Sequence, residues 1–327
     1  MKRYNNLFEK IITIENLIVA EKNARKHKSK TKSVKNFDKN KEDNIIKLHN
    51  LLKSKKFKTS EYKIFTIHKP KERIIYSLPY YPDRIVHHAI MNILEPIWTS
   101  LFISTTYSSI KKRGIHKCLF DIQKALKNKN ETTFCLKIDV EKFYPSINHD
   151  ILKKIIRKKI KCKNTLELLD EIIDSVEGVP IGNYLSQYFG NLYLTYLDHY
   201  IKEDLELKYY FRYCDDMVFL HYDKSILQEK LKLINNYLTN KLNLKLKSNY
   251  QIFPIKNRPI DFIGYVIDHD KTKLRKRIKQ NFIQKVKKLN KKGIRGDIYN
   301  KQLSSYLGWL KHGNCNNLKN KYIKNII

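Results

Sequence analysis

The strongest indication of the fold is the stretch Phe211-Arg212-Tyr213-Cys214-Asp215-Asp216-Met217-Val218-Phe219-Leu220. Residues 208–214 and 217–222 are apolar and aromatic runs that predict two strands, with a pair of acids between them. Inside a strand, neighbouring side chains point to opposite faces, whereas at a two-residue hairpin tip both carboxylates can approach one point in space. Asp also favours turns because its side chain bonds the nearby backbone, so the pair alone leaves an ordinary turn as the alternative interpretation.

A third acid adds weight to the pair. Asp139 ends an apolar run that predicts a strand over residues 132–139. From there to residue 267 the order is strand, helix, helix, two strands, helix and strand, which is close to a split βαβ arrangement. In such a sheet the end of the first strand lies beside the hairpin tip, so we expect Asp139, Asp215 and Asp216 to meet. Three carboxylates at one point can hold two divalent cations, and Mg²⁺ prefers such hard oxygen ligands.

Two motifs carry a family resemblance. Tyr213-Cys214-Asp215-Asp216 resembles the Y-x-D-D motif of reverse transcriptases, and the stretch from Asp139 to Tyr144 resembles their first catalytic motif. The resemblance implies an α+β right-hand polymerase fold with fingers, a split βαβ (ferredoxin-like) palm and a short helical thumb. It implies an RNA-directed DNA polymerase that copies template RNA into cDNA, with Asp139, Asp215 and Asp216 as catalytic residues. Those acids and the backbone of Val140 would hold two Mg²⁺ ions, which Mn²⁺ can replace.

The resemblance covers residues 60–315 and divides the chain. It implies a basic helical N-terminal extension (1–55), fingers (56–130 with 150–180), a palm (131–149 and 181–268) and a helical thumb (269–327). Within the extension, apolar spacing predicts one amphipathic helix over residues 5–20. Within the fingers, residues 61–67 and 73–78 predict a hairpin with a basic tip, and Pro82 and Pro96 are expected to open and close a helix.

The resemblance also assigns residues to the incoming dNTP. Cations at the hairpin tip would grip the triphosphate by charge-assisted hydrogen bonds, although surface lysines often do nothing specific. Tyr144 is the candidate steric gate beneath the deoxyribose, with an ordinary core aromatic as the other interpretation. The implied nucleotide-binding residues are Lys69, Lys71, Arg73, Phe143, Tyr144, Ile181, Gly182, Asn183 and Gln187.

One motif narrows the family. The pattern Pro-Ile-Gly-Asn-x-x-Ser-Gln at residues 180–187 resembles the reverse transcriptases of diversity-generating retroelements, whereas group II intron and retron enzymes usually have Gln-Gly after the Pro. Gln offers a polar amide to the nucleotide, while Ile181 offers only an apolar surface, which weakens discrimination. The resemblance therefore implies error-prone copying at template adenines, as in mutagenic retrohoming. The alternative is that Ile181 merely packs under its loop.

Contacts to nucleic acid are implied at Arg113, Tyr213, Gly264, Arg275 and Arg277. Arg113 lies in a basic loop that is expected to contact template phosphates. Gly264 lies in a stretch that resembles the primer grip, where glycine allows the backbone to approach DNA closely. The thumb arginines are expected to follow duplex phosphates.

Composition agrees with a polyanionic partner. The 327 residues include 66 Lys+Arg and 32 Asp+Glu, which gives a formal net charge of +34. Nucleic acid is the first candidate partner and an anionic membrane surface the second, while AT-rich codon usage could also supply part of the charge. The five cysteines are scattered without a C-x-x-C pair, which argues against a zinc site or a disulfide framework. We expect a cytoplasmic protein, because neither a signal peptide nor an apolar membrane span is recognisable.

The expected partners are template RNA, nascent cDNA, dNTPs and, by family analogy, a small basic accessory protein oligomer, with no membrane involved. Two other interpretations stay open. One is a reverse transcriptase of another bacterial class, such as a phage-defence, retron-like or intron-like enzyme. The other is a non-catalytic RNA-binding protein on a polymerase fold, which would not bind metal.

Overall fold

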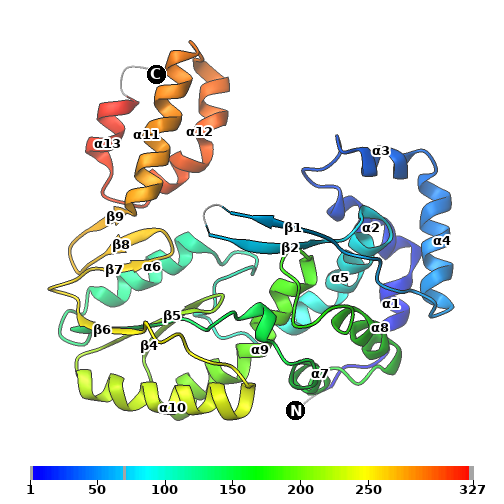
Figure 1. Ribbon diagram of the computed structural model, residues 1–327, viewed down its shortest axis with the longest axis horizontal. Coiled ribbons are helices and arrows are strands. Elements are labelled where there is room, and N and C mark those ends of the chain that lie inside the picture. Colours follow the sequence, from blue (N-terminus) through cyan, green and yellow to red (C-terminus); the bar gives the residue numbers. More distant parts are fainter. Residues whose placement is uncertain (1–2, 69–70, 324–327) are drawn as a thin grey trace.

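The central sheet positions the acids. The computed structural model describes residues 3–68 and 71–323, and in that part of the chain the sheet contains four antiparallel strands in the order β4-β5-β3-β6 (Figure 1). Their bounds are β3 (Phe134–Ile138), β4 (Tyr209–Tyr213), β5 (Asp216–His221) and β6 (Gln251–Pro254). β3 lies between β6, which follows the crossover through α10 (Lys224–Leu242), and β5, the second strand of the hairpin that follows the first helical crossover. This order is the predicted split βαβ palm.

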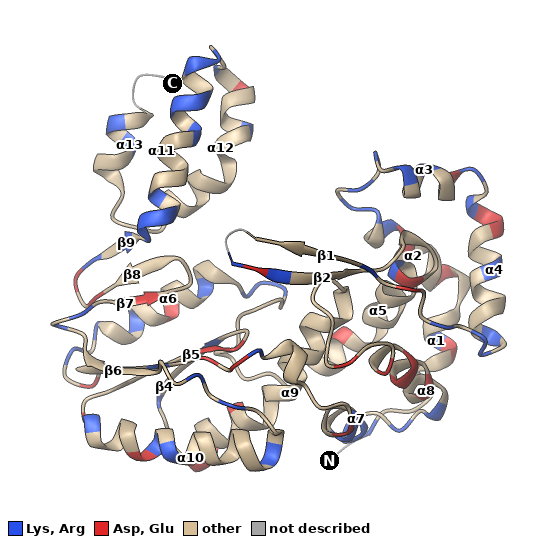
Figure 2. Ribbon diagram, viewed as in Figure 1, with Lys and Arg blue, Asp and Glu red and all other residues tan. Residues whose placement is uncertain are grey.

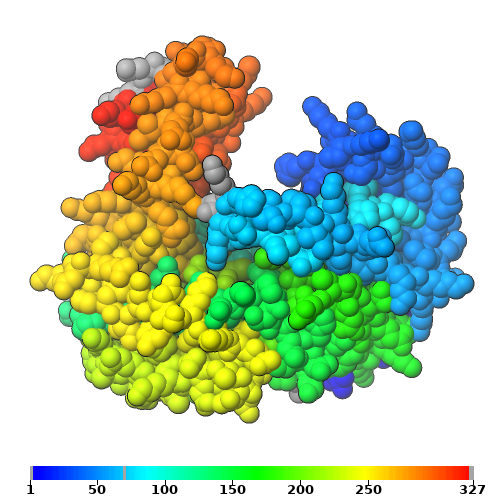
Figure 3. Space-filling model, in the orientation of Figure 1, coloured from blue at the N-terminus to red at the C-terminus, as the bar shows by residue number. Residues whose placement is uncertain are grey.

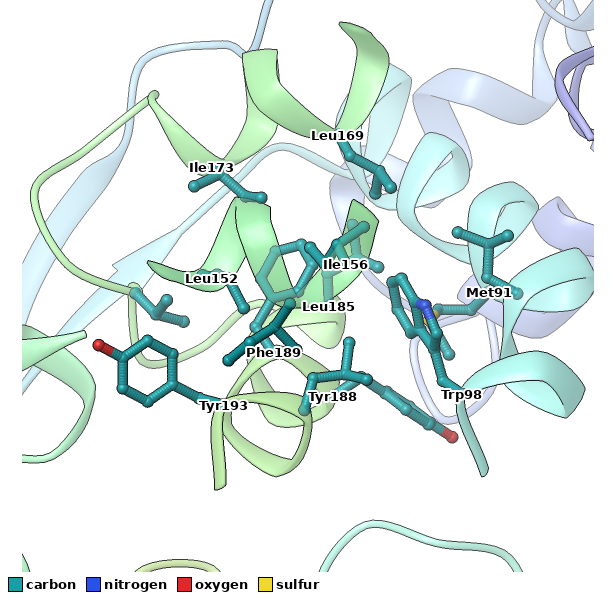
Figure 4. Close-up of a cluster of buried hydrophobic side chains, with 14 of the residues drawn as sticks. Met91, Trp98, Leu152, Ile156, Leu169, Ile173, Leu185, Tyr188, Phe189 and Tyr193 are labelled. Carbon is teal, nitrogen blue, oxygen red and sulfur yellow. The ribbon is translucent and has the colours of Figure 1, made fainter. Parts of the chain in front are cut away.

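Side chains alternate between two cores across this sheet. Leu136 and Phe219 pack into one core with helices α9 (Tyr184–His199) and α10 (Lys224–Leu242). Cys135 and Val218 face the other core with helix α6 (Ile115–Leu126). Both faces are thus covered, as the near-continuous apolar runs of β3 and β5 require. The first core extends along α9 to helices α7 (His149–Arg157) and α8 (Lys163–Ile173), and Figure 4 shows Phe189 of α9 among these side chains.

The N-terminal extension is part of the first core. Its helices are α1 (Phe8–Ile12), α2 (Ile14–Ala24), α3 (Lys32–Asp38) and α4 (Lys41–Lys53). The prediction of one helix over residues 5–20 is wrong. The chain breaks at Thr13, whose hydroxyl accepts the Asn16 N–H at 3.2 Å and so caps α2. The break turns Ile14 and Ile18 outward, where they are 39% and 47% exposed.

The fingers hairpin forms as predicted. β1 (Lys63–Ile67) pairs antiparallel with β2 (Arg73–Ser77), so Ile67 lies opposite Arg73 next to the tip. A wide turn over Tyr80–Arg84 leads into α5 (Ile85–Thr99). The expected stop at Pro96 is wrong, because α5 continues through it to Thr99. Pro96 removes one backbone bond, but the turn that follows buries Trp98 in the core, and this burial outweighs the loss.

The C-terminal part forms a separate lobe. A small sheet, β7 (Ile260–Phe262), β8 (Tyr265–Ile267) and β9 (Thr272–Leu274), leads into α11 (Lys276–Lys291), α12 (Gly296–Lys311) and α13 (Asn316–Tyr322). The pair β8–β9 spans the predicted palm–thumb boundary at 268–269. The surface is hollowed between this lobe and the N-terminal helices (Figure 3), and Lys and Arg recur along α11 (Figure 2). Of the described helices, none combines the length and apolar character that a bilayer crossing requires.

Candidate active site

The hairpin turn comes one residue earlier in the chain than predicted, so only Asp215 of the acid pair lies in it. Tyr213 pairs with Asp216, so Cys214 and Asp215 form the two-residue tip and Asp216 already belongs to β5. Cys214 takes a φ of 62°, the left-handed conformation that tight hairpin turns of this length require. The turn holds Asp215 at the end of the sheet.

Asp139 meets this turn from the neighbouring strand. Ile138 lies opposite Met217 in the β3–β5 register, which brings the next residue, Asp139, alongside Asp216. Burial, the charge of Asp139 and a hydrogen bond with its carboxyl group raise the pKa of Asp215 to about 7. Burial and the charge of Asp139 also raise the pKa of Asp216. The structure thus brings the three acids close enough for their charges to interact, and their joint role as metal ligands stays a prediction.

The chemistry of this donor set fits Mg²⁺ bound together with substrate. In the part of the chain that the structure describes, no three His, Cys, Asp or Glu side chains form a ready-made metal site. Mg²⁺ does not need one, because it usually binds one or two carboxylates together with water and substrate phosphates. Val140 forms an isolated antiparallel bridge with Leu246. No described residue donates a backbone hydrogen bond to the Val140 carbonyl oxygen. Val140 is fully buried, so the role of that oxygen as a further hard ligand stays a prediction.

Lys247 is a site residue that the sequence did not reveal. Its ammonium forms an ion pair with the Asp139 carboxylate. In a chain with 66 Lys+Arg, one more lysine carries no signal. Lys247 lies near Asp139 because the segment after α10 pairs with the residues that follow β3. The sequence predicted that segment only as part of a strand and did not predict what it pairs with.

A buried ion pair supports the turn from behind. The side chains of Arg212 and Asp198 are both fully buried, and Arg212 Nε donates to Asp198 Oδ1 at 2.7 Å. Burial lowers the pKa of Arg212, but the charge of Asp198 and its hydrogen bonds to the guanidinium together outweigh burial, so the net shift is upward. Arg212 Nη1 also donates to the Cys214 carbonyl at 2.8 Å, so the pair fixes the turn. Removing one partner would leave a buried charge and cost about 3–5 kcal/mol.

Two aromatics from the first catalytic motif pack under the turn. Phe143 is buried, and Tyr144, whose ring centroid lies 5.2 Å away, is half-buried and bonds Cys214 Sγ through its hydroxyl at 3.2 Å. A Cβ on Gly190 would lie 3.1 Å from both rings, so glycine makes room for them on α9. Tyr144 therefore lies beside the acids, where a gate would have to be.

The motif that narrowed the family forms a loop against the fingers hairpin. The Tyr76 N–H of β2 donates to the Ile181 carbonyl at 2.9 Å. Gly182 takes a φ of 125°, and a Cβ there would lie 2.7 Å from the Tyr76 carbonyl oxygen. Asn183 is buried and donates to Tyr62 at 3.4 Å. Ile181 itself is half-buried, so its side chain lies partly at the surface rather than wholly beneath the loop.

The remaining nucleotide-binding candidates are exposed. Gln187 lies on the outer side of α9, and Lys71 and Arg73 lie on the hairpin, all three accessible to solvent. Arg73 forms no ion pair with any described residue, so its guanidinium is available for a triphosphate. Lys69 lies outside the described residues.

The residues predicted to contact nucleic acid differ in their protein partners and in their exposure to solvent. Arg113 donates to the Ile103 carbonyl at 2.6 Å and so stabilises its own loop. Tyr213 is half-buried beside the second core, at the end of β4. Arg275 pairs with Asp261 at 2.6 Å, at the start of α11. Arg277 is exposed on α11.

Gly264 allows a close approach, but the neighbour is protein. Its φ is 89°, and a Cβ there would lie 2.6 Å from the Trp309 ring of α12. The close approach seen at Gly264 in this structure is thus to α12, and the contact with DNA stays a prediction. Arg275 N–H donates to the Gly264 carbonyl at 3.0 Å, so the same residue anchors the start of α11.

Comparisons with known proteins agree with this geometry. The profile of the family "Reverse transcriptase (RNA-dependent DNA polymerase)" matches residues 54–267, more than half of the chain. Protein YkfC of Escherichia coli K12 is 27% identical over 139 residues, 38% of this chain and 36% of that protein. The group II intron-encoded protein LtrA of Lactococcus lactis is 23% identical over 143 residues, 40% of this chain and 23% of LtrA. The chain thus spans about a third or less of these relatives' length.

Solved structures show the same fold. Apo telomerase from Candida tropicalis superposes with a TM-score of 0.51 at 16% identity, over 68% of this chain and 49% of that one. Telomerase from Candida albicans, in complex with a fragment of telomeric RNA, gives a TM-score of 0.51 at 13% identity, over 75% and 52% of the two chains. At such identities the likeness concerns the fold alone.

Proposed function

The chain belongs to the reverse transcriptase (RNA-dependent DNA polymerase) family, and from that membership we propose that it copies template RNA into cDNA by nucleotidyl transfer. The observation that carries the proposal is the meeting of Asp139 with Asp215 and Asp216 at the end of the palm sheet. A non-catalytic RNA-binding protein has no need to hold like charges together in a half-buried place, because such clustering costs free energy until a cation joins it.

We assign a separate role in nucleotidyl transfer to each group of site residues. Asp139, Asp215, Asp216 and the Val140 carbonyl would hold two Mg²⁺ ions, or Mn²⁺ in their place. When bound, such ions supply the charge that lowers the pKa of the primer 3′-hydroxyl and stabilises the leaving pyrophosphate.

Around these acids, the exposed cations of the fingers hairpin, Lys71 and Arg73, hold the triphosphate of the dNTP. Tyr144 excludes a 2′-hydroxyl, because the hydrogen bond to Cys214 fixes its ring beside the acids. The hydrogen bond from Tyr76 to Ile181 keeps the hairpin and the nucleotide loop together.

We place the enzyme among the mutagenic reverse transcriptases of diversity-generating retroelements. The support is the Pro180-Ile181-Gly182-Asn183 loop, in which Ile181 presents an apolar side chain where a polar one is usual. A small basic accessory protein oligomer and a structured template RNA belong to this proposal. The five cysteines are all free, which suits a reducing cytoplasm.

The second candidate is an intron-like reverse transcriptase. The observation in its favour is that the curated relatives include LtrA and the putative COX1/OXI3 intron 2 protein of Saccharomyces cerevisiae. Both candidates make cDNA. They differ in fidelity, since only the first is expected to misincorporate at template adenines.

Primer extension on an RNA template tests the polymerase activity. Asp215→Asn should reduce the rate roughly a thousandfold, because it removes a charge that acts on the transition state. RNA binding should not change. The matched control is Asp43→Asn, which removes an exposed acid on α4, away from the palm sheet. If Asp215→Asn extended primers as fast as the control, the site assignment would be wrong.

A further inference from the structure

Lys247 lies beside Asp139 because the backbone fixes both residues. The Lys247 N–H donates to the Asp139 carbonyl at 3.0 Å, and the Glu141 N–H donates to the Lys245 carbonyl at 2.8 Å. Between these bonds, Val140 faces Leu246 in an antiparallel bridge. Residues directly opposite in such a ladder project their side chains to the same face. The ion pair between the Lys247 ammonium and the Asp139 carboxylate is therefore built into the register.

Other cations near the acids already have different partners. Lys137 Nζ donates to the Asp261 carbonyl at 2.8 Å, and Arg275 pairs with the Asp261 carboxylate at 2.6 Å. Over residues 3–68 and 71–323, Lys247 alone forms an ion pair with one of the three acids. Its side chain is 27% exposed and that of Asp139 is 29% exposed, so water screens the pair only in part.

We propose that Lys247 is an intrinsic cation of the carboxylate site, one that holds Asp139 in place in the metal-free enzyme and competes with divalent ions for it. The proposal rests on the proposed function, because it takes Asp139 as a metal ligand. An ammonium group and a divalent ion at one carboxylate repel each other, so metal binding must displace the ammonium or share the oxygen at a cost. The lysine thereby weakens metal binding to the free enzyme and favours loading together with the polyanionic dNTP, which adds negative charge.

Direct Mn²⁺ binding to the full chain, without nucleic acid or dNTP, tests the competition. Free Mn²⁺ can be followed by electron paramagnetic resonance. Lys247→Met keeps the apolar stem but removes the charge, and it should bind Mn²⁺ about fivefold more tightly, the upper range for a partly exposed ion pair. Lys247→Arg keeps the charge and should bind Mn²⁺ as the unaltered protein does.

Lys245 provides the matched control. It pairs with Glu141 at 3.8 Å, two cross-strand pairs further along the ladder than Asp139 and Lys247, and its side chain is 84% exposed. Lys245→Met removes the same charge from the same segment and should leave Mn²⁺ binding unchanged. If Lys247→Met and Lys245→Met both bound Mn²⁺ more tightly to the same extent, the increase would be explained by the change in net charge alone. That result would overturn the proposal.

Unchanged or weaker Mn²⁺ binding by a folded Lys247→Met protein would also overturn it, as would the absence of measurable binding in every variant. If Lys247→Met does not fold, Lys247→Gln carries the same test. Primer extension separates this proposal from the proposed function. A protein that never extends a primer, yet binds Mn²⁺ more tightly after Lys247→Met, refutes the polymerase activity and retains the competition.

Discussion

At the scale of single residues, the sequence predicted what its motifs contain and missed what only the fold brings together. Asp139, Asp215 and Asp216 could be found because each ends or begins an apolar run, and acids there are conspicuous. Lys247 could not, because its proximity to Asp139 depends on a register that spans α10. Asp198 is an intermediate case, since a lone acid in an otherwise apolar helical stretch is a signal for a buried partner.

Ile181 carries the prediction about fidelity. Ile181→Gln places an amide where the loop now has an apolar side chain, while its backbone bond to Tyr76 can remain. A mismatched nucleotide would lose the polar contact that a matched nucleotide forms, so it would be incorporated less often. We therefore expect the frequency of misincorporation opposite template adenine to fall by about tenfold. Sequencing of cDNA made on a defined RNA template measures this frequency.

Ile181→Val is the control for that prediction, because it stays apolar and removes only a methylene group. Its error frequency should match that of the unaltered protein. An Ile181→Gln enzyme that still misincorporates opposite adenine at the original frequency would remove this residue from the account of fidelity. Uniformly low errors in the unaltered protein would favour the intron-like candidate.

At the scale of elements, period and apolarity predicted which segments are helices and strands, whereas the ends were decided by local chemistry. The hairpin β1–β2 and the palm strands follow their alternating or apolar runs. The break between α1 and α2 depends on one hydroxyl at Thr13, which a count of apolar positions does not register. The continuation of α5 past Pro96 depends on burial of Trp98, which no local rule contains.

The contact between the β7–β8 turn and α12 gives a prediction at this scale. Gly264→Ala meets both a φ of 89° and the Trp309 ring at 2.6 Å, so it should lower the free energy of unfolding by about 2–4 kcal/mol. Gly293→Ala meets a φ of 65° but has nothing within 4 Å, so it measures the backbone strain alone, about 1 kcal/mol. Denaturant unfolding of the two variants separates the cost of backbone strain from the cost of the clash with Trp309. Equal losses would show that Trp309 does not press on Gly264.

At the scale of the whole molecule, the motifs predicted a right-hand polymerase fold and the order of its strands, and the structure confirms both. The sequence did not predict that the extension before residue 55 joins the main core. Leu17 and Leu48 are fully buried there, and the Asn16 side chain donates to the Ala89 carbonyl of α5 at 3.0 Å. A segment without a recognised motif can only be placed by the surface it covers, and that surface comes from other parts of the chain.

The central claim concerns two distant segments of the chain, the end of β3 and the β4–β5 turn, which the fold joins into one metal-binding point. Diffraction at the manganese absorption edge, from crystals of the protein with a template–primer, dNTP and Mn²⁺, locates the metal directly. We predict an anomalous peak within coordination distance of both Asp139 and Asp215. A peak elsewhere, or a peak bound by only one of these two segments, would contradict the account.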